Sequence, residues 1–424
     1  MDRELAARAK KYIRARILRL LYRVDLHRPL DPDLVVHGAY WNRGVACNPA
    51  AIHAKALEIV PRLRHVWVVG SRHVGRVPDG VEHVVAGSRA YWRVMATATY
   101  LVNNSSFPGG FSKRDGQVYL QTHHGTPLKS MGLDQRRYPA SARGMDFEKI
   151  LAHVGQWDFS LAANPHAAEV WERVYPAAYE QLHLGQPRND RYFTATSDEV
   201  AAIRASLGIA PGSRVLLYAP THRDEGVGHF SPPLDLERFV RETGDEYVLL
   251  VRAHYFHGTS AGLAETRPRV VDVTGHPRVE DLCLASDALI TDYSSLLFDY
   301  ACLDRPIVVH APDWQAYRAT RGTYFDLLSG RPGDTPGALS TSDDELIGLF
   351  RDGGWDSEAS AGLRGAFRAR FCPYDDGHAA ERVVRRLFLD ERPPRNGPGP
   401  GPETDPDPDL SPGPGPAPSP GWTG

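Results

Sequence analysis

Short apolar runs rich in β-branched residues alternate with segments of helical periodicity along most of this chain. In the first half the runs are 65–70, 82–87, 98–105, 117–125 and 159–166, and in the second half they are 214–223, 246–254, 269–275, 287–295 and 306–312. Runs that are apolar almost throughout, rather than at every second position, are typical of strands buried on both faces of a parallel sheet. The pattern therefore predicts an α/β protein with two parallel sheets covered by helices.

The two ends of the chain depart from this pattern. Residues 1–24 carry apolar side chains at helical spacing among eight arginine and lysine residues. This predicts a basic amphipathic helix within residues 1–30, which either lies on an anionic membrane surface or packs on its own domain with a solvated basic face. Residues 391–424 are dominated by proline and glycine, a composition that cannot bury a core, so we expect a disordered tail without a functional site. Between the ends we expect two Rossmann-like domains, residues 31–195 and 196–390.

Composition narrows the choice of partners and compartment. The net charge of −3 argues against a protein that binds nucleic acid over its whole surface. No apolar run is long enough to cross a membrane, and the charged N-terminus argues against a cleaved secretory signal. The four cysteines show no CxxC spacing, which argues against a disulfide framework or a zinc site and favours a reducing, cytoplasmic compartment.

Polar side chains follow several of the predicted strands, and the segment QTHHGTPLKSMG (121–132) is the richest of these strand ends. Ligands of open α/β sheets bind outside the carboxyl ends of the strands. His124 is delivered to such an end, Gly125 permits a tight turn, and Lys129 follows within reach of a phosphate. Because histidine titrates near neutral pH, His124 is a candidate general base for an alcohol. We expect His123 to be a neighbour that hydrogen-bonds the turn.

Cationic side chains recur in a turn near the end of the first half and at strand ends of the second half. Arg188, in LGQPRND (184–190), can grip a diphosphate with two hydrogen bonds or form a salt bridge between the domains. Thr221 and Arg223 follow a strand of the second half. Arg252 and His254 lie two residues apart, so they face the same side of an extended chain and can clamp a phosphate.

The segment DALITDYSSLLFDYACLDRPIVVH (287–310) places Asp292, Ser294 and Ser295 between a strand and an apolar helix. Serines at a helix start cap its free N–H groups, and the same groups bind phosphate oxygens. Phosphate-loop, zinc-protease and nucleophile-elbow motifs are missing from the sequence, as are paired acids of DxD type at a strand end. We therefore expect no protein metal site and no required cofactor, with phosphate charge balanced by Lys129 and the arginines. Mg²⁺ can still arrive bound to a diphosphate.

In their order, QTHHGTPLK, GQPRND, YAPTHRD, RAH, DALITDYSSLLFDYACLDRPIV and RGTYFD (321–326) resemble the CDP-glycerol glycerophosphotransferases, which make bacterial teichoic acids. The resemblance spans roughly residues 35–388. It implies a GT-B-like fold with the active site in the cleft between an acceptor-side first domain and a CDP-donor-binding second domain. It also implies His124 as the base and His254 as a second essential imidazole. The donor-binding residues that we expect are Gly125, Thr126, Lys129, Arg188, Thr221, Arg223, Arg252, Thr274, Gly275, Asp292, Ser294 and Ser295.

The reaction implied by the resemblance is transfer of glycerol phosphate from CDP-glycerol to a hydroxyl of a lipid-linked or polymeric acceptor, with release of CMP. A location on the inner face of the cell membrane follows, reached through residues 1–24. His123 stands where the family often has tryptophan, so CDP-ribitol or a nucleotide sugar are alternative donors. A non-catalytic protein of the membrane surface on the same fold is the alternative from another class.

Overall fold

The computed structural model describes residues 2–108, 110–221, 234–252 and 269–391. Arg223, His254 and nearly all of the expected C-terminal tail lie outside the described residues. Among the described residues, no helix combines the length and apolar character needed to cross a membrane.

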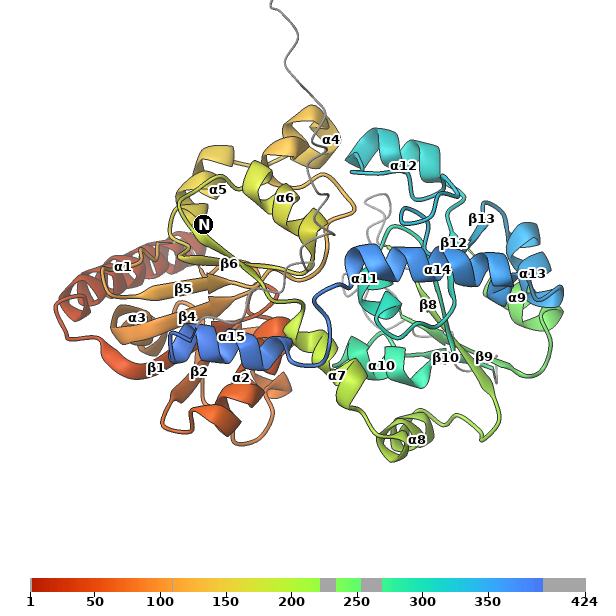
Figure 1. Cartoon of the computed structure of the whole chain (residues 1–424). Helices are drawn as coiled ribbons and strands as arrows, with labels where there is room; N and C mark the ends of the chain where they lie inside the picture. The colour runs from red at the N-terminus through yellow and green to blue at the C-terminus, as the bar shows by residue number, and fades with distance from the viewer. Residues whose placement is uncertain (1, 109, 222–233, 253–268, 392–424) are drawn as a thin grey trace, which may run out of the picture. The chain divides into compact units, whose positions relative to one another are not determined.

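The first half of the chain forms a seven-stranded parallel sheet in the order β3-β2-β1-β4-β5-β6-β7 (Figure 1). Its strands are β1 (Asp31–Gly38), β2 (Arg64–Val69), β3 (His83–Val85), β4 (Ala98–Asn103), β5 (Val118–Gln121), β6 (Phe159–Ala162) and β7 (Glu180–His183). Strands β1 and β4 are parallel neighbours from which the chain winds outward in opposite directions. Such a reversal of strand order is where open α/β sheets bind their ligands.

The second half forms a six-stranded parallel sheet in the order β10-β9-β8-β11-β12-β13. Its strands are β8 (Arg214–Ala219), β9 (Tyr247–Val251), β10 (Val270–Asp272), β11 (Ala288–Thr291), β12 (Ile307–His310) and β13 (Ala338–Ser340). Here the order reverses between β8 and β11, which pair in parallel. The two sheets confirm the predicted architecture of two Rossmann-like halves, and both reversal points lie beside predicted site residues.

Helices cover the sheets. The longer ones are α1 (Asp2–Asp25), α2 (Cys47–Ile59), α3 (Arg89–Thr97), α5 (Phe147–Val154), α6 (Pro165–Val174), α8 (Ser197–Ser206), α9 (Leu236–Glu242), α10 (Val279–Ala285), α12 (Trp314–Arg321), α13 (Asp343–Arg351), α14 (Glu358–Phe371) and α15 (Ala379–Phe388). Shorter turns of helix are α4 (Pro139–Ala142), α7 (Asp190–Thr194), α11 (Leu296–Ala301), η1 (Ser71–Arg76), η2 (Gly132–Arg137), η3 (Pro187–Asn189) and η4 (Gly354–Asp356).

The last helix returns to the first sheet. Val383, Val384 and Leu387 of α15 pack with Ile52 of α2 and Val35 of β1 in one buried apolar cluster. Figure 1 shows α15, in blue, beside the red and orange elements from the start of the chain. The segment between α14 and α15 therefore passes from the second core to the first, and the domain limits 31–195 and 196–390 stay predictions.

The sequence pattern missed three strands, and the most central of them is β1. Its apolar stretch is only Leu34, Val35 and Val36, followed by His37, which is buried. The acidic residues Asp31 and Asp33 precede this short run, so the pattern of apolar residues alone did not identify β1 as a strand. Burial between β2 and β4 supplies the stability that local propensity does not.

Candidate active site

His124 follows β5 by three residues, and its ring is oriented by the backbone. Its Nδ1 lies 2.9 Å from the carbonyl oxygen of Asn104. A carbonyl can only accept a hydrogen bond, so Nδ1 carries the proton and donates it. The other nitrogen, Nε2, is then the unprotonated one in the neutral ring. This is the tautomer that a general base needs.

The surroundings of His124 favour its neutral form. Burial lowers its pKa below the ordinary value of 6.5, and the positive charge of Arg188 acts in the same direction, whereas the bond to Asn104 opposes both. The rings of Tyr40 and Trp41 stand edge-on to the imidazole, with centroids 5.8 and 6.0 Å away. At neutral pH the ring can therefore accept a proton.

Beside His124 the backbone takes a strained path. Tyr40, Trp41 and Asn42 follow β1 with φ of 47°, 54° and 66°, a left-handed conformation that costs side-chain-bearing residues of order 1–3 kcal/mol each. Hydrogen bonds hold it: the Tyr40 amide donates to Asn104 Oδ1 (2.8 Å), and the Trp41 amide donates to Ser105 Oγ (2.9 Å). Sequence reasoning missed this turn, whose only signal was Asn42, a residue that tolerates positive φ.

Arg188 is buried in a network that joins the two halves. Its Nη2 lies 2.5 Å from Oδ2 of Asp299 on α11, and its Nη1 lies 3.1 Å from Cys47 Sγ and 3.4 Å from the Tyr40 hydroxyl. Arg188 is 7% exposed and Asp299 3%. The interdomain salt bridge that the sequence offered as one alternative is therefore present, and it holds the guanidinium next to the ring that stands against His124.

Gly125 brings the turn after His124 against the start of α11. A Cβ on Gly125 would lie 2.8 Å from Ser295 Oγ and 3.5 Å from Arg188 Nη2, and its φ of +146° also disfavours a side chain. Ser295 makes no capping hydrogen bond with its side chain, while Ser294 Oγ accepts one from the Leu296 amide at 3.3 Å. Three predicted motifs, around residues 124, 188 and 295, thus meet in space.

Asp292 ties together the strand ends at the reversal point of the second sheet. Its Oδ1 accepts hydrogen bonds from the amides of Thr221 (2.8 Å) and Tyr293 (2.5 Å). Arg252, after β9, donates to the carbonyl oxygen of His276 at 2.9 Å, and burial lowers the pKa of its guanidinium. It thereby holds the turn that follows β10.

Thr274 and Gly275 lie in that turn. The Thr274 amide donates to Asp272 Oδ1 at 2.9 Å, and Gly275 is exposed with open space where a Cβ would stand. Glu280 is a charged neighbour that sequence reasoning missed. Burial raises the pKa of its carboxyl, against the opposing charges of Arg188 and Arg252. Its position at the start of a helix gave no sign of a role beyond helix stabilisation.

Lys129 and the RGTYFD segment are direct neighbours. Lys129 and Thr323 form an antiparallel bridge, and the Tyr324 amide donates to the Leu128 carbonyl at 2.9 Å. The Lys129 ammonium lies 5.7 Å from the centroid of the Tyr317 ring. The first and last motifs of the chain are thus joined by backbone hydrogen bonds, which no local pattern predicts.

Two predicted residues face the protein interior. His123 stacks on Trp171 with centroids 4.2 Å apart, its Nε2 lies 2.9 Å from Ser160 Oγ, and burial lowers its pKa to about 3. It is a core residue and does not wall the space around His124. The hydroxyl of Thr126 accepts a hydrogen bond from Asn164 Nδ2 at 2.8 Å. Because Thr126 is only 2% exposed, its side chain stabilises the turn.

Comparison with known proteins points to one family. The sequence pattern of the family described as CDP-Glycerol:Poly(glycerophosphate) glycerophosphotransferase matches residues 20–389. A teichoic acid poly(glycerol phosphate) polymerase of Bacillus spizizenii is 29% identical over 88% of this chain and 96% of its own length. The Bacillus subtilis polymerase is also 29% identical, and the match covers 50% of its length, so this chain spans about half of that relative. A teichoic acid ribitol-phosphate primase of Bacillus spizizenii is 30% identical over 84% of this chain and 91% of its own length.

The fold has a solved counterpart. The wall teichoic acid polymerase TagF, as a variant soaked with CDPG, superimposes with a TM-score of 0.80 at 27% identity, covering 92% of this chain and 97% of that one. This match confirms the predicted GT-B-like fold. With the family pattern matched from residue 20 to residue 389 and a solved relative over nearly the whole described structure, the chain belongs to the CDP-glycerol:poly(glycerophosphate) glycerophosphotransferase family.

Proposed function

We propose that this chain transfers a glycerol-phosphate unit from CDP-glycerol to a hydroxyl group of a lipid-linked or polymeric acceptor and releases CMP. Membership of the family supports the reaction class. The single observation that carries the residue-level proposal is the hydrogen bond from His124 Nδ1 to Asn104, because it leaves Nε2 free to accept a proton.

The proposed step is an in-line displacement at the β-phosphorus. The acceptor hydroxyl gives its proton to His124 Nε2 while its oxygen forms a bond to that phosphorus. The bond from the β-phosphorus to the bridging oxygen breaks, and CMP leaves with the electron pair. Arg188 and Arg252 supply positive charge near the diphosphate, since positioning and electrostatics dominate phosphoryl transfer. His254 is proposed to act with them because the family resemblance implies it, and Arg223 because it follows a strand of the second half, where a guanidinium suits a phosphate.

The donor is tested by measuring CMP or UMP release from CDP-glycerol, CDP-ribitol and a UDP-sugar, with a lipid-linked or polymeric acceptor and mass analysis of the product. We expect CMP from CDP-glycerol and a product heavier by one glycerol-phosphate unit. His27→Ala, at an exposed histidine, is the matched control and should behave as wild type.

Release of CMP from CDP-ribitol but not from CDP-glycerol would show that the donor is CDP-ribitol. The proposed mechanism would stay the same. The 30% identity to a ribitol-phosphate primase is the observation that supports CDP-ribitol as the second candidate donor. Release of no nucleotide from any donor would contradict the enzyme proposal and favour the non-catalytic surface protein.

We further propose that α1 docks the protein on the inner face of an anionic membrane. One side of the helix packs on the first domain through Leu18 and Tyr22. The other side exposes an apolar stripe at helical spacing: Ile13 (56% exposed), Ile17 (52%), Leu20 (63%) and Val24 (57%). Exposed arginines flank the stripe at 14, 16, 19 and 23. Apolar residues among arginines suit the boundary between lipid headgroups and acyl chains.

Replacing Ile17 and Leu20 with serine should lower the partition coefficient onto anionic vesicles by at least about 10-fold, since each burial of such a side chain contributes roughly 1.5–3 kcal/mol. Co-sedimentation with vesicles, compared with neutral vesicles and with added salt, measures this. Leu57→Ser, at another exposed leucine (51%), is the control. Equal binding of the double variant and wild type, or equal binding to neutral and anionic vesicles, would refute the docking proposal.

A further inference from the structure

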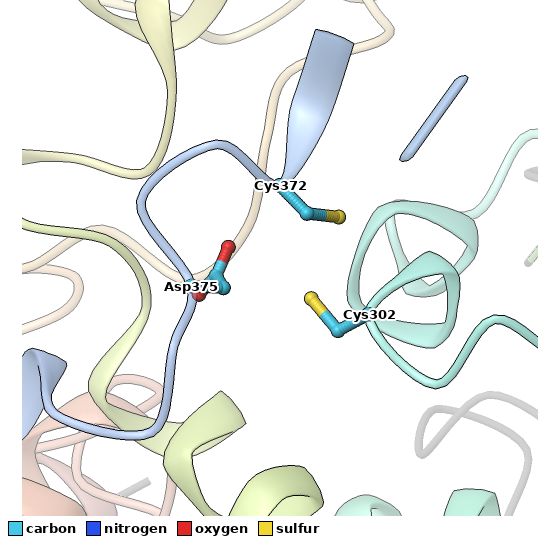
Figure 2. A group of neighbouring side chains, drawn as sticks. All are labelled: Cys302, Cys372 and Asp375. Carbon is cyan, nitrogen blue, oxygen red and sulfur yellow. The ribbon is translucent and has the colours of Figure 1, made fainter. Parts of the chain in front are cut away.

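Two cysteines and an aspartate, from two distant parts of the sequence, meet beside the Arg188 network. Cys302 follows α11 directly, Cys372 follows α14 directly, and Asp375 lies in the segment that leads to α15. Their ligand atoms, two sulfurs and a carboxylate oxygen, all lie within 4.8 Å of one another. Figure 2 shows the two sulfur atoms turned toward each other with the Asp375 carboxylate beside them. In the part of the chain that the structure describes, this is the one such group of histidine, cysteine and acidic side chains.

Asn189, the last residue of η3, closes the group from a third segment. Its Nδ2 lies 3.5 Å from both Cys302 Sγ and Asp375 Oδ1, which is an ordinary hydrogen-bond distance to sulfur and a long one to oxygen. Its Oδ1 is buried and accepts no hydrogen bond from the described residues. Turning the amide over exchanges the two atoms, and it points an oxygen with free lone pairs at the cysteine and the aspartate.

The two thiols and the carboxylate are ligand types that bind a divalent cation. Asp375 accepts a hydrogen bond from the Gln186 amide at 3.0 Å, and its carboxylate forms no salt bridge within the described residues. A divalent ion bound here would balance the negative charges of the deprotonated thiols and the carboxylate.

We propose that Cys302, Cys372, Asp375 and Asn189 form a binding site for one Zn²⁺ ion. Thiolate and oxygen ligands in a closed set of four are typical of structural zinc. Tetrahedral zinc with bonds of about 2.3 Å holds two thiolates about 3.8 Å apart, so atoms already within 4.8 Å need to close by at most about 1 Å. Binding converts both thiols to thiolates and releases their protons to solvent.

The ion would join three elements that carry the candidate active site. η3 contains Arg188, α11 contains Asp299, and the segment after α14 leads the chain back to the first sheet. Zinc would therefore stabilise the junction of the two halves, in a role independent of the proposed transfer reaction. The spacing of the cysteines in the sequence argued against zinc, because the ligands come from segments that only the fold brings together.

The test uses the full chain, purified under reducing conditions, stripped with a chelator and titrated with Co²⁺ and then Zn²⁺. We expect one equivalent of Co²⁺ per chain with sulfur-to-cobalt charge-transfer absorption that Zn²⁺ abolishes. Cys302→Ser and Cys372→Ser should each weaken Zn²⁺ binding by at least about 100-fold in chelator competition. Cys283→Ser, at another buried cysteine, is the matched control and should bind as wild type.

Circular dichroism shows whether the serine variants fold, and Asp375→Asn serves as a further variant that leaves both thiols in place. Absence of Zn²⁺ and Co²⁺ binding by the reduced wild-type chain would overturn the proposal whatever the variants do. Unchanged affinity in folded Cys302→Ser or Cys372→Ser would also overturn it. A Cys302–Cys372 disulfide recovered from cells by thiol trapping would do the same.

Discussion

Replacement of His124 with alanine is expected to lower kcat by about 10²–10⁴-fold while the protein remains folded, the range that a positioned general base contributes. The side chain lies just past the end of a strand, keeps part of its surface exposed, and donates a hydrogen bond to the Asn104 carbonyl. Its loss should therefore affect the reaction far more than the free energy of unfolding. Nucleotide release under saturating donor measures kcat, and urea unfolding measures stability.

The pH dependence gives the same residue a second test. The neutral ring is the active form, and burial lowers the pKa of His124 below 6.5. Activity should therefore persist below pH 6.5 and fall only as the pH drops through this lowered pKa. His27→Ala should keep both the rate and the profile. Near-wild-type turnover in folded His124→Ala, or an acidic limb above pH 6.5, would assign the proton transfer to another group.

Replacement of Arg188 with alanine is expected to destabilise the protein by about 3–5 kcal/mol and to abolish transfer. The change leaves the Asp299 carboxylate buried without its partner, and an uncompensated buried charge carries a cost of that size. Burial already raises the pKa of Asp299, with Arg188 acting against the rise. Urea denaturation measures the stability and nucleotide release measures the activity.

A double variant separates the two roles of Arg188. Arg188→Met with Asp299→Leu removes both charges, so it should unfold at higher urea concentration than Arg188→Ala and still be inactive. Arg62→Ala, which breaks the exposed pair with Asp33, is the control and should change stability by no more than about 1 kcal/mol. Activity retained by the double variant would show that Arg188 acts only in folding.

Much of the fold was predictable because its signals are local. Apolar runs of strand length identified most of the strands in each sheet. The polar residues after them led to the prediction that His124 and Asp292 lie near a ligand, and the turn LGQPRND led to the same prediction for Arg188. His124 and Gly125 could be placed from sequence because they follow directly from the end of β5, and strand ends meet at one edge of a parallel sheet. The helical periodicity of residues 1–24 likewise predicted α1.

Other features depend on contacts between segments far apart in the sequence. The left-handed turn at Tyr40–Asn42 is stable only because Asn104 and Ser105, from the neighbouring strand end, bind its amides. The role of His123 as a core residue follows from the position of Trp171, nearly fifty residues later.

The sequence by itself determined the alternation of strands and helices, the residues at the strand ends and the basic helix. These follow from period and propensity, which act over a few residues. Only the tertiary structure decided that Arg188 pairs with Asp299, that Lys129 bridges to Thr323, and that the thiols of Cys302 and Cys372 lie beside the Asp375 carboxylate. Those pairings depend on strand order and on the return of the chain to its first sheet. The entropy lost when such distant segments come together is offset by burial of the whole core, and no local pattern encodes it.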